Sequence, residues 1–226
     1  MSLRIAYIGA GGFTNCFMYP QLKRHDVELA AVCDLEESKA VAAQRAYGFK
    51  SVYTDFRKML EAEKPNAVFC VGGPKVHHPV GLEVLDRGFP LYVQKPPAPT
   101  SAATREMADL AARRGVVCHV GFNLRFAPAM FQAKRIMREE KFGAPLLGIF
   151  RYGLCSFPTA EGYVMDQHCH LTDLARWLKG EVEEVQAVKS AEGKDYVLAV
   201  RFASGAVGTL NFTSGQPIEK EFIYFE

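Results

Sequence analysis

Residues 3–14 of the chain are LRIAYIGAGGFT, a short apolar stretch that runs directly into a glycine-rich turn. A helix is expected after the turn, to about His25, and a second apolar stretch over residues 27–33 ends on Asp34. Strand, glycine turn, helix, strand and acid in this order are typical of a dinucleotide-binding unit.

Each part of this turn has a physical reason to be there. Gly9 permits the tight turn, and Gly11 lets the backbone approach a pyrophosphate. Gly12 and Phe13 lead into the following helix, whose N-terminal N–H groups favour phosphate charge. The third glycine position holds Thr14, so the match is incomplete, and a purely structural turn is the alternative.

Asp34 lies at the distance along the chain where an acid accepts hydrogen bonds from a ribose 2′-OH. A carboxylate there repels a 2′-phosphate. The sequence therefore predicts NAD as the cofactor, with NADP possible.

The alternation continues beyond this unit. Helices are expected over residues 36–47, 55–62, 76–87 and 101–114, and strands over residues 51–53, 67–71, 91–93 and 116–120. Strands that alternate with helices predict an α/β fold with a doubly wound parallel sheet. We assign it residues 1–120, as an NAD(P)-binding Rossmann domain.

Three strand ends are expected at one edge of this sheet, where ligands of open α/β sheets bind. Gly72 and Pro74 follow one strand and can let a cofactor lie close to the backbone. Gln94 and Lys95 follow the next, and a lysine held there can act in proton transfer. Asn123 and Arg125 follow the last strand and can hydrogen-bond a polar substrate, although a surface ion pair is the plain interpretation of Arg125. His77 and His78 open a helix, where solvated or capping histidines are the common case.

The pattern changes near residue 120. A helix is expected over residues 128–140 and another over 166–178, followed by strands over 182–189, 196–202, 206–212 and 219–225, with a further strand over 146–153. Consecutive strands joined by short turns, such as Ser204-Gly205, predict a mainly antiparallel sheet with one open face. We assign residues 121–226 to a second domain of the α+β class, to which the family resemblance described below gives a role in substrate binding and oligomerisation.

The most informative motif of this half is Asp166-Gln167-His168-Cys169-His170-Leu171-Thr172-Asp173. Asp166 and His170 are four residues apart and Asp173 is three further on, so they share a helix face. A carboxylate beside an imidazole fixes its tautomer and suits a general acid or base. The adjacent histidines and cysteine diverge around a helix, so we expect no metal site.

Composition narrows the class of protein. The chain has 226 residues and a net charge of +2 with interspersed signs, and no basic stripe indicates nucleic-acid binding. No apolar run has the ~18 residues of a membrane span, and the N-terminus does not resemble a signal peptide. The six cysteines form neither a disulfide framework nor a CxxC pair, so a cytoplasmic location is expected.

Over nearly its whole length the chain resembles the Gfo/Idh/MocA oxidoreductases, the glucose–fructose oxidoreductase and inositol dehydrogenase group. The matching residues are Gly9-Ala10-Gly11, Cys33-Asp34, Pro74-Lys75-Val76-His77-His78, Gln94-Lys95-Pro96, residues 121–126, and Asp166, His170 and Asp173. The resemblance implies a Rossmann domain, then a domain with an open sheet that commonly forms homodimers or higher homo-oligomers.

The resemblance also implies hydride transfer between NAD(P) and a secondary alcohol or ketone of a sugar, polyol or cyclitol. It places Lys95, Asp166 and His170 in the catalytic set, leaving open whether Lys95 or His170 is the base. His78 and Gln94 would lie by the cofactor, and Asn123, Arg125 and Asp173 by the substrate. Gln94 stands where the family has Glu, Lys75 where it has Asn, and the chain is shorter than is usual for the family.

Two other functions remain open from the sequence. One is a redox-assisted elimination or glycoside cleavage in which NAD is regenerated. The other is a catalytically silent NAD-binding regulator, which Gln94 and the short chain favour slightly, while the presence of Lys95, Asp166 and His170 argues against it.

Overall fold

The computed structural model describes residues 2–144, 146–153, 164–193, 195–213 and 220–225. The chain divides into two compact units, Met1–Gly121 and Phe122–Glu226. Each unit has its own sheet and its own hydrophobic core. Among the described residues, no helix combines the length and the apolar character needed to cross a bilayer.

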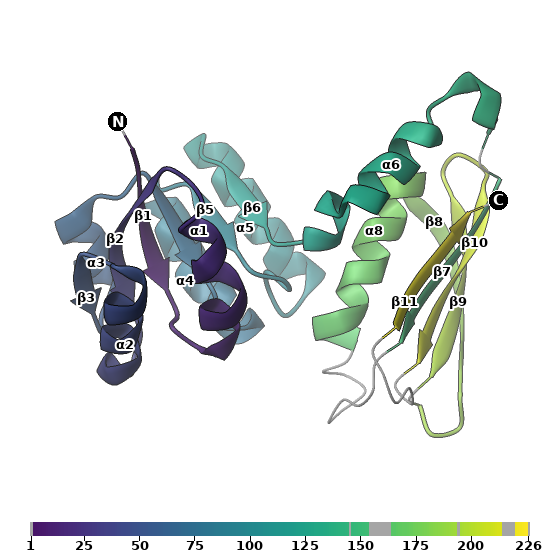
Figure 1. Ribbon diagram of the computed structural model, residues 1–226. Coiled ribbons are helices and arrows are strands. Elements are labelled where there is room, and N and C mark those ends of the chain that lie inside the picture. The colour runs from purple at the N-terminus through teal and green to yellow at the C-terminus, as the bar shows by residue number, and fades with distance from the viewer. Residues whose placement is uncertain (1, 145, 154–163, 194, 214–219, 226) are drawn as a thin grey trace. The chain divides into compact units, whose positions relative to one another are not determined.

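The first unit is built on a six-stranded sheet in the order β3-β2-β1-β4-β5-β6 (Figure 1). Every pair of neighbouring strands is parallel. The expected doubly wound fold is confirmed, because the order reverses between β1 and β4. The strands are β1 (Leu3–Ile8), β2 (Val27–Cys33), β3 (Ser51–Tyr53), β4 (Ala67–Cys70), β5 (Leu91–Val93) and β6 (Cys118–Val120).

Helices cover the two faces of this sheet. One core joins α3, α4 and α5 to the strands through residues such as Met59, Val84 and Met107. A second core joins α1 and α2 to the other face through Tyr7, Tyr19 and Ala40. The helices are α1 (Tyr19–Leu22), α2 (Glu37–Tyr47), α3 (Phe56–Glu63), α4 (Pro74–Asp86) and α5 (Ser101–Arg114).

The helix after the glycine turn differs from the expected continuous helix. Residues Thr14–Met18 form a π-helical segment, and the α-helix α1 ends at Leu22. Pro20 explains the change, because proline has no N–H to donate to the preceding turn. Tyr19 Oη instead donates to Gly9 O at 3.0 Å, and Tyr47 Oη donates to Asn15 O at 2.7 Å. The buried Tyr19 and the half-buried Tyr47 thus hold the irregular segment against the sheet.

The second unit contains a five-stranded sheet in the order β11-β7-β10-β9-β8. Three neighbouring pairs are antiparallel, as expected, but β7 and β10 are parallel, with Leu147 opposite Val207. The sheet is therefore mixed. Its strands are β7 (Leu147–Gly153), β8 (Val182–Lys189), β9 (Tyr196–Phe202), β10 (Val207–Thr213) and β11 (Lys220–Phe225). The helical elements are η2 (Asn123–Phe126), α6 (Pro128–Ile136), η3 (Glu140–Phe142), η4 (Val164–His168) and α8 (Cys169–Lys179).

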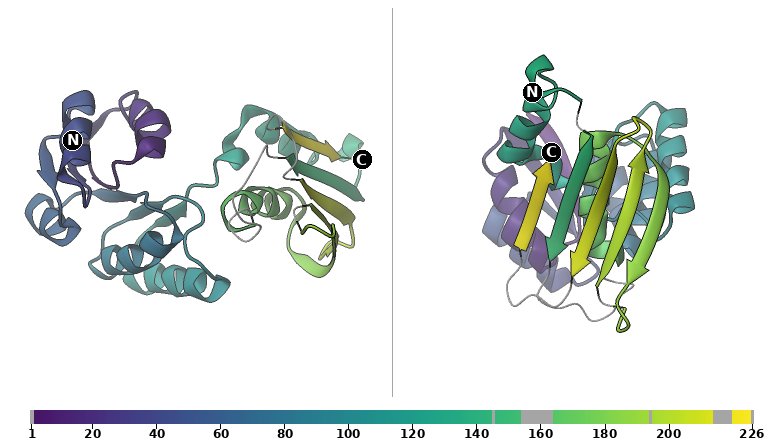
Figure 2. Two further views of the ribbon diagram at one scale, coloured as in Figure 1. Left: turned by 90° about the horizontal axis from the view of Figure 1, so that it is seen from below. Right: turned by 90° about the vertical axis from the view of Figure 1, so that its right-hand side faces the viewer.

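Among the described residues, the hydrophobic core of this second sheet lies on one face. Leu171, Leu174 and Leu178 of α8 pack on Phe150 and Phe202, which belong to that face. The opposite face holds Val188, Val197 and Val207, which are 73%, 40% and 48% exposed. Figure 2 (right) shows this face without a helix in front of it. Alternation of buried and exposed residues along β9 and β10 gives the sheet one covered and one open side, as the sequence predicted.

Candidate active site

Gly9 has a backbone position that only glycine can occupy. Its φ is +102°, and a Cβ there would lie 1.9 Å from Val71 O. Gly9 N donates to Cys33 O at 2.8 Å. The turn after β1 therefore touches both neighbouring strand ends, those of β2 and β4.

The backbone beyond Gly9 is open to a ligand. Gly11 and Gly12 are exposed, and a Cβ on either would meet nothing within 4 Å. Phe13 follows them and is 45% exposed. An uncovered glycine backbone that leads into a helical segment fits the pyrophosphate of a dinucleotide.

Asp34 lies beside this turn and helps to hold it. Its Oδ2 accepts the N–H of Ala10 at 2.7 Å, and its Oδ1 accepts the N–H of Glu36 at 2.9 Å. A carboxylate oxygen has more than one acceptor site, so both oxygens can also accept ribose hydroxyls. The negative charge and the open glycines fit a dinucleotide, and the charge opposes a 2′-phosphate.

The turn after β4 is built around His77 and not around His78. Gly73 has a φ of +84°, and Pro74 opens α4. His77 is 0% exposed, and its Nε2 accepts the N–H groups of Gly72 and Gly73 at 2.9 and 3.0 Å. His77 is thus neither solvated nor a simple cap, which differs from the sequence expectation. His78 Nε2 lies 2.9 Å from Glu106 Oε2 of α5.

The turn after β5 carries Gln94, Lys95 and Pro96. Gln94 is buried, and its Oε1 accepts the N–H of Lys95 at 2.8 Å. Lys95 is half-buried, and the Lys95–Pro96 peptide is cis. Gly121 leaves room for this turn, since a Cβ on it would lie 2.5 Å from Gln94 Oε1. The hydrogen bond from the Lys95 N–H to Gln94 Oε1 therefore forms without a negative charge on residue 94.

These turns follow neighbouring parallel strands, so they lie at one edge of the first sheet. The structure brings together the glycine turn, Asp34, Gly72 to Pro74, Gln94 and Lys95 at the carboxyl ends of β1, β2, β4 and β5. His77, which the sequence did not assign to the site, links two of these turns. The available signals were the position of this histidine, three residues after the Gly-Pro pair, and its place in the Pro74–His78 stretch that resembles the family.

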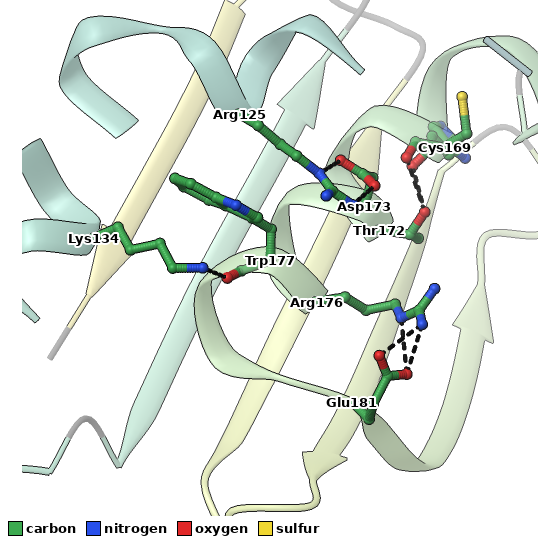
Figure 3. A network of polar contacts seen from close by, with 9 residues as sticks. Arg125, Lys134, Cys169, Thr172, Asp173, Arg176, Trp177 and Glu181 are labelled. Atoms are coloured by element: carbon green, nitrogen blue, oxygen red, sulfur yellow. Dashed lines mark hydrogen bonds and ion pairs between the residues drawn. The ribbon is translucent and has the colours of Figure 1, made fainter. Parts of the chain in front are cut away.

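In the second unit, Arg125 and Asp173 form an ion pair between η2 and α8 (Figure 3). Arg125 Nε donates to Asp173 Oδ2 at 2.6 Å, and Nη2 donates to Oδ1. The Asp173 side chain is 9% exposed and that of Arg125 37%. The two residues expected near a substrate are therefore bound to each other, in the two-pronged geometry that guanidinium groups favour.

Asp166 and His170 lie on the same helical run as Asp173. Asp166 Oδ2 accepts Gln167 Nε2 at 2.7 Å, and Gln167 Oε1 accepts Tyr152 Oη at 3.1 Å. His170 is 9% exposed, and its ring meets that of Phe122 edge-on at 6.3 Å. Arg125 lies over the same Phe122 ring, 6.0 Å from its centre. The Phe122 ring thus lies near both the imidazole of His170 and the guanidinium of Arg125.

His168 is a core residue. It is 2% exposed, and its ring lies 3.9 Å from that of Phe212 and 4.6 Å from that of Tyr196. Burial lowers its pKa to about 3, so it stays neutral at ordinary pH. The described residues contain no cluster of three side chains that could hold a metal ion.

Comparison with known proteins defines the class of protein. Residues 3–122 match the oxidoreductase family model with an NAD-binding Rossmann fold (GFO_IDH_MocA), and residues 130–224 match the GFO/IDH/MocA C-terminal domain. The chain belongs to the Gfo/Idh/MocA family.

Particular relatives are dehydrogenases. D-glucoside 3-dehydrogenase of Escherichia coli K12 is 39% identical over 55% of this chain and 36% of its own length. Inositol 2-dehydrogenase 4 of Saccharopolyspora erythraea is 32% identical over 82% of this chain and 56% of its own. A dehydrogenase structure from Chromobacterium violaceum shares the fold with a TM-score of 0.93 at 24% identity, over 100% of this chain and 70% of that one. The chain spans about half the length of the curated relatives it matches.

Proposed function

We propose that this chain carries the cofactor-binding and catalytic groups of an NAD-dependent dehydrogenase, with NADP as the second possible cofactor. Its substrate would be a secondary alcohol, or the matching ketone, of a sugar, polyol or cyclitol. The observation that carries the proposal is the sheet edge where the open glycine turn, Asp34 and Lys95 follow neighbouring strands. The names of the two curated relatives support the substrate class.

Cofactor binding is assigned to residues of the first unit. Asp34 would accept the ribose hydroxyls, since its two oxygens are already oriented by backbone N–H groups. The remaining members of the set are Gly9, Gly11, Gly12, Phe13, Gly72, Pro74, His78 and Gln94. The neutral Gln94 would accept a hydrogen bond but would not attract a cation as Glu does.

Bound NAD would supply the hydride acceptor for the substrate carbon that carries the hydroxyl. We assign removal of the hydroxyl proton to Lys95 or His170, with the other group binding the oxygen. Asp166 would orient them. Groups that interact in this way titrate as a set, so a pH profile reports the set and not one residue.

Substrate binding is assigned to Asn123, Arg125 and Asp173. A guanidinium has five N–H donors, and Asp173 takes Nε and one Nη2 donor of Arg125. The pair can therefore hold its geometry while it offers further donors to substrate hydroxyls. This arrangement suits a neutral polyol better than a carboxylate substrate, because Asp173 offsets the charge of Arg125.

The test is a screen of sugars, polyols and cyclitols with NAD or NADP, followed at the nicotinamide absorbance. Lys95→Ala should lower kcat/KM by about 100-fold or more, the usual contribution of a positioned acid or base. Lys58→Ala is the matched control, because Lys58 is an exposed lysine of α3. A Lys95→Ala enzyme as active as the Lys58→Ala control would remove Lys95 from the catalytic set.

The same assay separates the other two functions. Redox-assisted elimination would consume substrate without net formation of NADH. A silent regulator would bind NADH but turn over none of the substrates; the neutral Gln94 beside Lys95 is the observation that favours it. Gln94→Glu restores the family residue, so a large gain in turnover would identify Gln94 as the cause of low activity.

We also propose that the chain forms a homodimer or higher homo-oligomer through the open face of the second sheet. This face carries Val188, Val197 and Val207 and a hollow of about 570 Å³ beside Arg151 and Asn211. Exposed apolar patches of this kind commonly mark interfaces. Val188→Glu with Val197→Glu should lower the mass measured by light scattering, whereas an unchanged mass would rule out this face.

A cytoplasmic location is proposed from the cysteines. Cys16, Cys33, Cys70 and Cys118 are free thiols. Burial raises the pKa of both the Cys33 and Cys70 thiols to about 12. Such thiols are inert and need no oxidising compartment. Cell fractionation with an antibody to the chain tests the location.

A further inference from the structure

His77 lies inside the first unit, at the place where two functional turns meet. It belongs to the first part of α4 and is 0% exposed. Its Nε2 accepts the N–H groups of Gly72 and Gly73, at 2.9 and 3.0 Å, and its Nδ1 lies 2.8 Å from Pro96 O. One imidazole thus joins the turn after β4 to the turn after β5.

The partners of His77 determine its protonation state. Nδ1 faces a carbonyl oxygen, which can only accept, so Nδ1 carries the proton. Nε2 faces two N–H donors and must offer its lone pair. Burial, together with the nearby positive charge of Lys95, lowers the pKa of His77, which also favours the neutral ring. The ring is therefore a neutral Nδ1–H tautomer whose three contacts are all satisfied.

These contacts fix the backbone on both sides of Lys95. Gln94 Oε1 accepts the N–H of Lys95, and His77 donates to the carbonyl of Pro96, the next residue. On its other side, His77 holds Gly72 and Gly73, directly before Pro74. Because His77 is fully buried, it cannot itself touch a substrate or cofactor in this arrangement.

We propose that His77 is a positioning residue. It fixes the position of the turn that carries Lys95 relative to the Gly72–Pro74 turn at the edge of the sheet. The catalytic part of this role rests on the proposed dehydrogenase function. The two ring nitrogens divide the role: Nδ1 serves the Lys95 turn, and Nε2 serves the cofactor-side turn.

Two substitutions separate the two nitrogens. The Asn amide reaches about as far as Nδ1, so His77→Asn keeps a donor for Pro96 O and loses the acceptor for the glycine N–H groups. The Gln side chain reaches about as far as Nε2, so His77→Gln keeps that acceptor and loses the donor to Pro96 O. His25→Asn and His25→Gln are matched controls, since His25 is exposed and outside the proposed site.

The two substitutions should affect different quantities, one mainly kcat and the other mainly the Kd for NADH. His77→Gln should lower kcat about 10- to 100-fold with little change in the Kd for NADH, because a small displacement of a reacting group has an effect of this order. His77→Asn should raise the Kd for NADH about tenfold or more and should lower kcat less. If both variants instead change both parameters in proportion to their loss of stability, or change neither, the positioning role is wrong.

A measurement that needs no enzymatic turnover tests the three His77 hydrogen bonds, called the clamp here, independently of activity. In the wild-type protein, ¹⁵N NMR of the His77 ring should show the Nδ1–H tautomer, unchanged between pH 6 and 8, and slow exchange of the Gly72 and Gly73 amide protons. An Nε2–H tautomer or an imidazolium would overturn the proposal even if neither variant folds. Absence of turnover in the wild type, with the clamp intact by NMR, would refute the dehydrogenase function alone.

Discussion

Gly9→Ala is expected to destabilise the first unit by about 2–5 kcal/mol. A Cβ would lie 1.9 Å from Val71 O, and real Cβ contacts below 3.0 Å essentially never occur, so the two atoms must separate by at least 1.1 Å (3.0 − 1.9). Both groups belong to backbone tied by hydrogen bonds, Gly9 N to Cys33 O and Val71 N to Ile8 O. Loss of both bonds costs about 1–3 kcal/mol, and a left-handed φ adds about 1–2 kcal/mol for alanine.

Two other glycines separate these contributions. Gly48 has a φ of +83° but open space around its Cβ position. Gly48→Ala should therefore lower the free energy of unfolding by about 0.5–1.5 kcal/mol. This net value combines the unfavourable left-handed conformation of alanine with the smaller stabilisation that comes from restricting the unfolded chain. Gly12 has neither feature, and Gly12→Ala should stay within about 0.5 kcal/mol of the wild type.

The assay is urea unfolding followed by far-UV circular dichroism, with hydrogen exchange of the β1 and β4 amides. Trp177, the single tryptophan, lies in the second unit, so its fluorescence reports that unit separately. If Gly9→Ala costs no more than Gly48→Ala, the close approach of Gly9 to Val71 is not required by the fold, and the reasoning fails.

The remaining predictions concern charge. Asp34→Asn should raise the affinity for NADPH relative to NADH about tenfold, equivalent to about 1.4 kcal/mol, because it removes the charge that opposes a 2′-phosphate; fluorescence titration with both nucleotides measures the ratio, and an unchanged ratio counts against this role. Arg125→Lys should destabilise the second unit by about 1 kcal/mol, and the value is small because the Arg125 side chain is 37% exposed. The midpoint of urea unfolding, followed by Trp177 fluorescence, measures this loss, and an unchanged midpoint would mean that the ion pair contributes nothing to stability. His168 has a folded pKa of about 3, whereas the unfolded chain takes up this proton near pH 6.5, so stability should fall by up to about 1.4 kcal/mol per pH unit as the pH drops from 6.5 toward 3. His168→Phe should flatten this slope, and an equal slope in both proteins would contradict the assignment.

Much of the fold could be predicted from the sequence because the elements have strong local signals. The strand Val182–Lys189 and the strand Tyr196–Phe202 have the expected bounds, since alternating side chains and turn residues delimit them. The glycine turn and Asp34 were likewise evident from spacing. The parallel pairing of β7 with β10 was not, because Leu147 and Val207 are joined only by tertiary structure.

The site was less predictable where a residue's role depends on distant partners. His77 and His78 are adjacent and chemically identical, yet one is fully buried between two turns and the other pairs with Glu106. Helix periodicity alone does not reveal what each face will meet. Arg125 and Asp173 are 48 positions apart, so nothing local indicated that they would bind each other.

The parallel neighbour of β7 has a consequence for synthesis of the protein. Val207 emerges from the ribosome 60 residues after Leu147 (207 − 147), which takes roughly 3–12 s at ordinary elongation rates. Until then the apolar segment Leu147–Gly153 lacks the partner that makes it an interior strand. During translation the second unit therefore exposes an apolar strand segment without its neighbouring strand. The fraction of chains in which this unit folds should depend on chaperone capacity and growth temperature more than the corresponding fraction for the first unit.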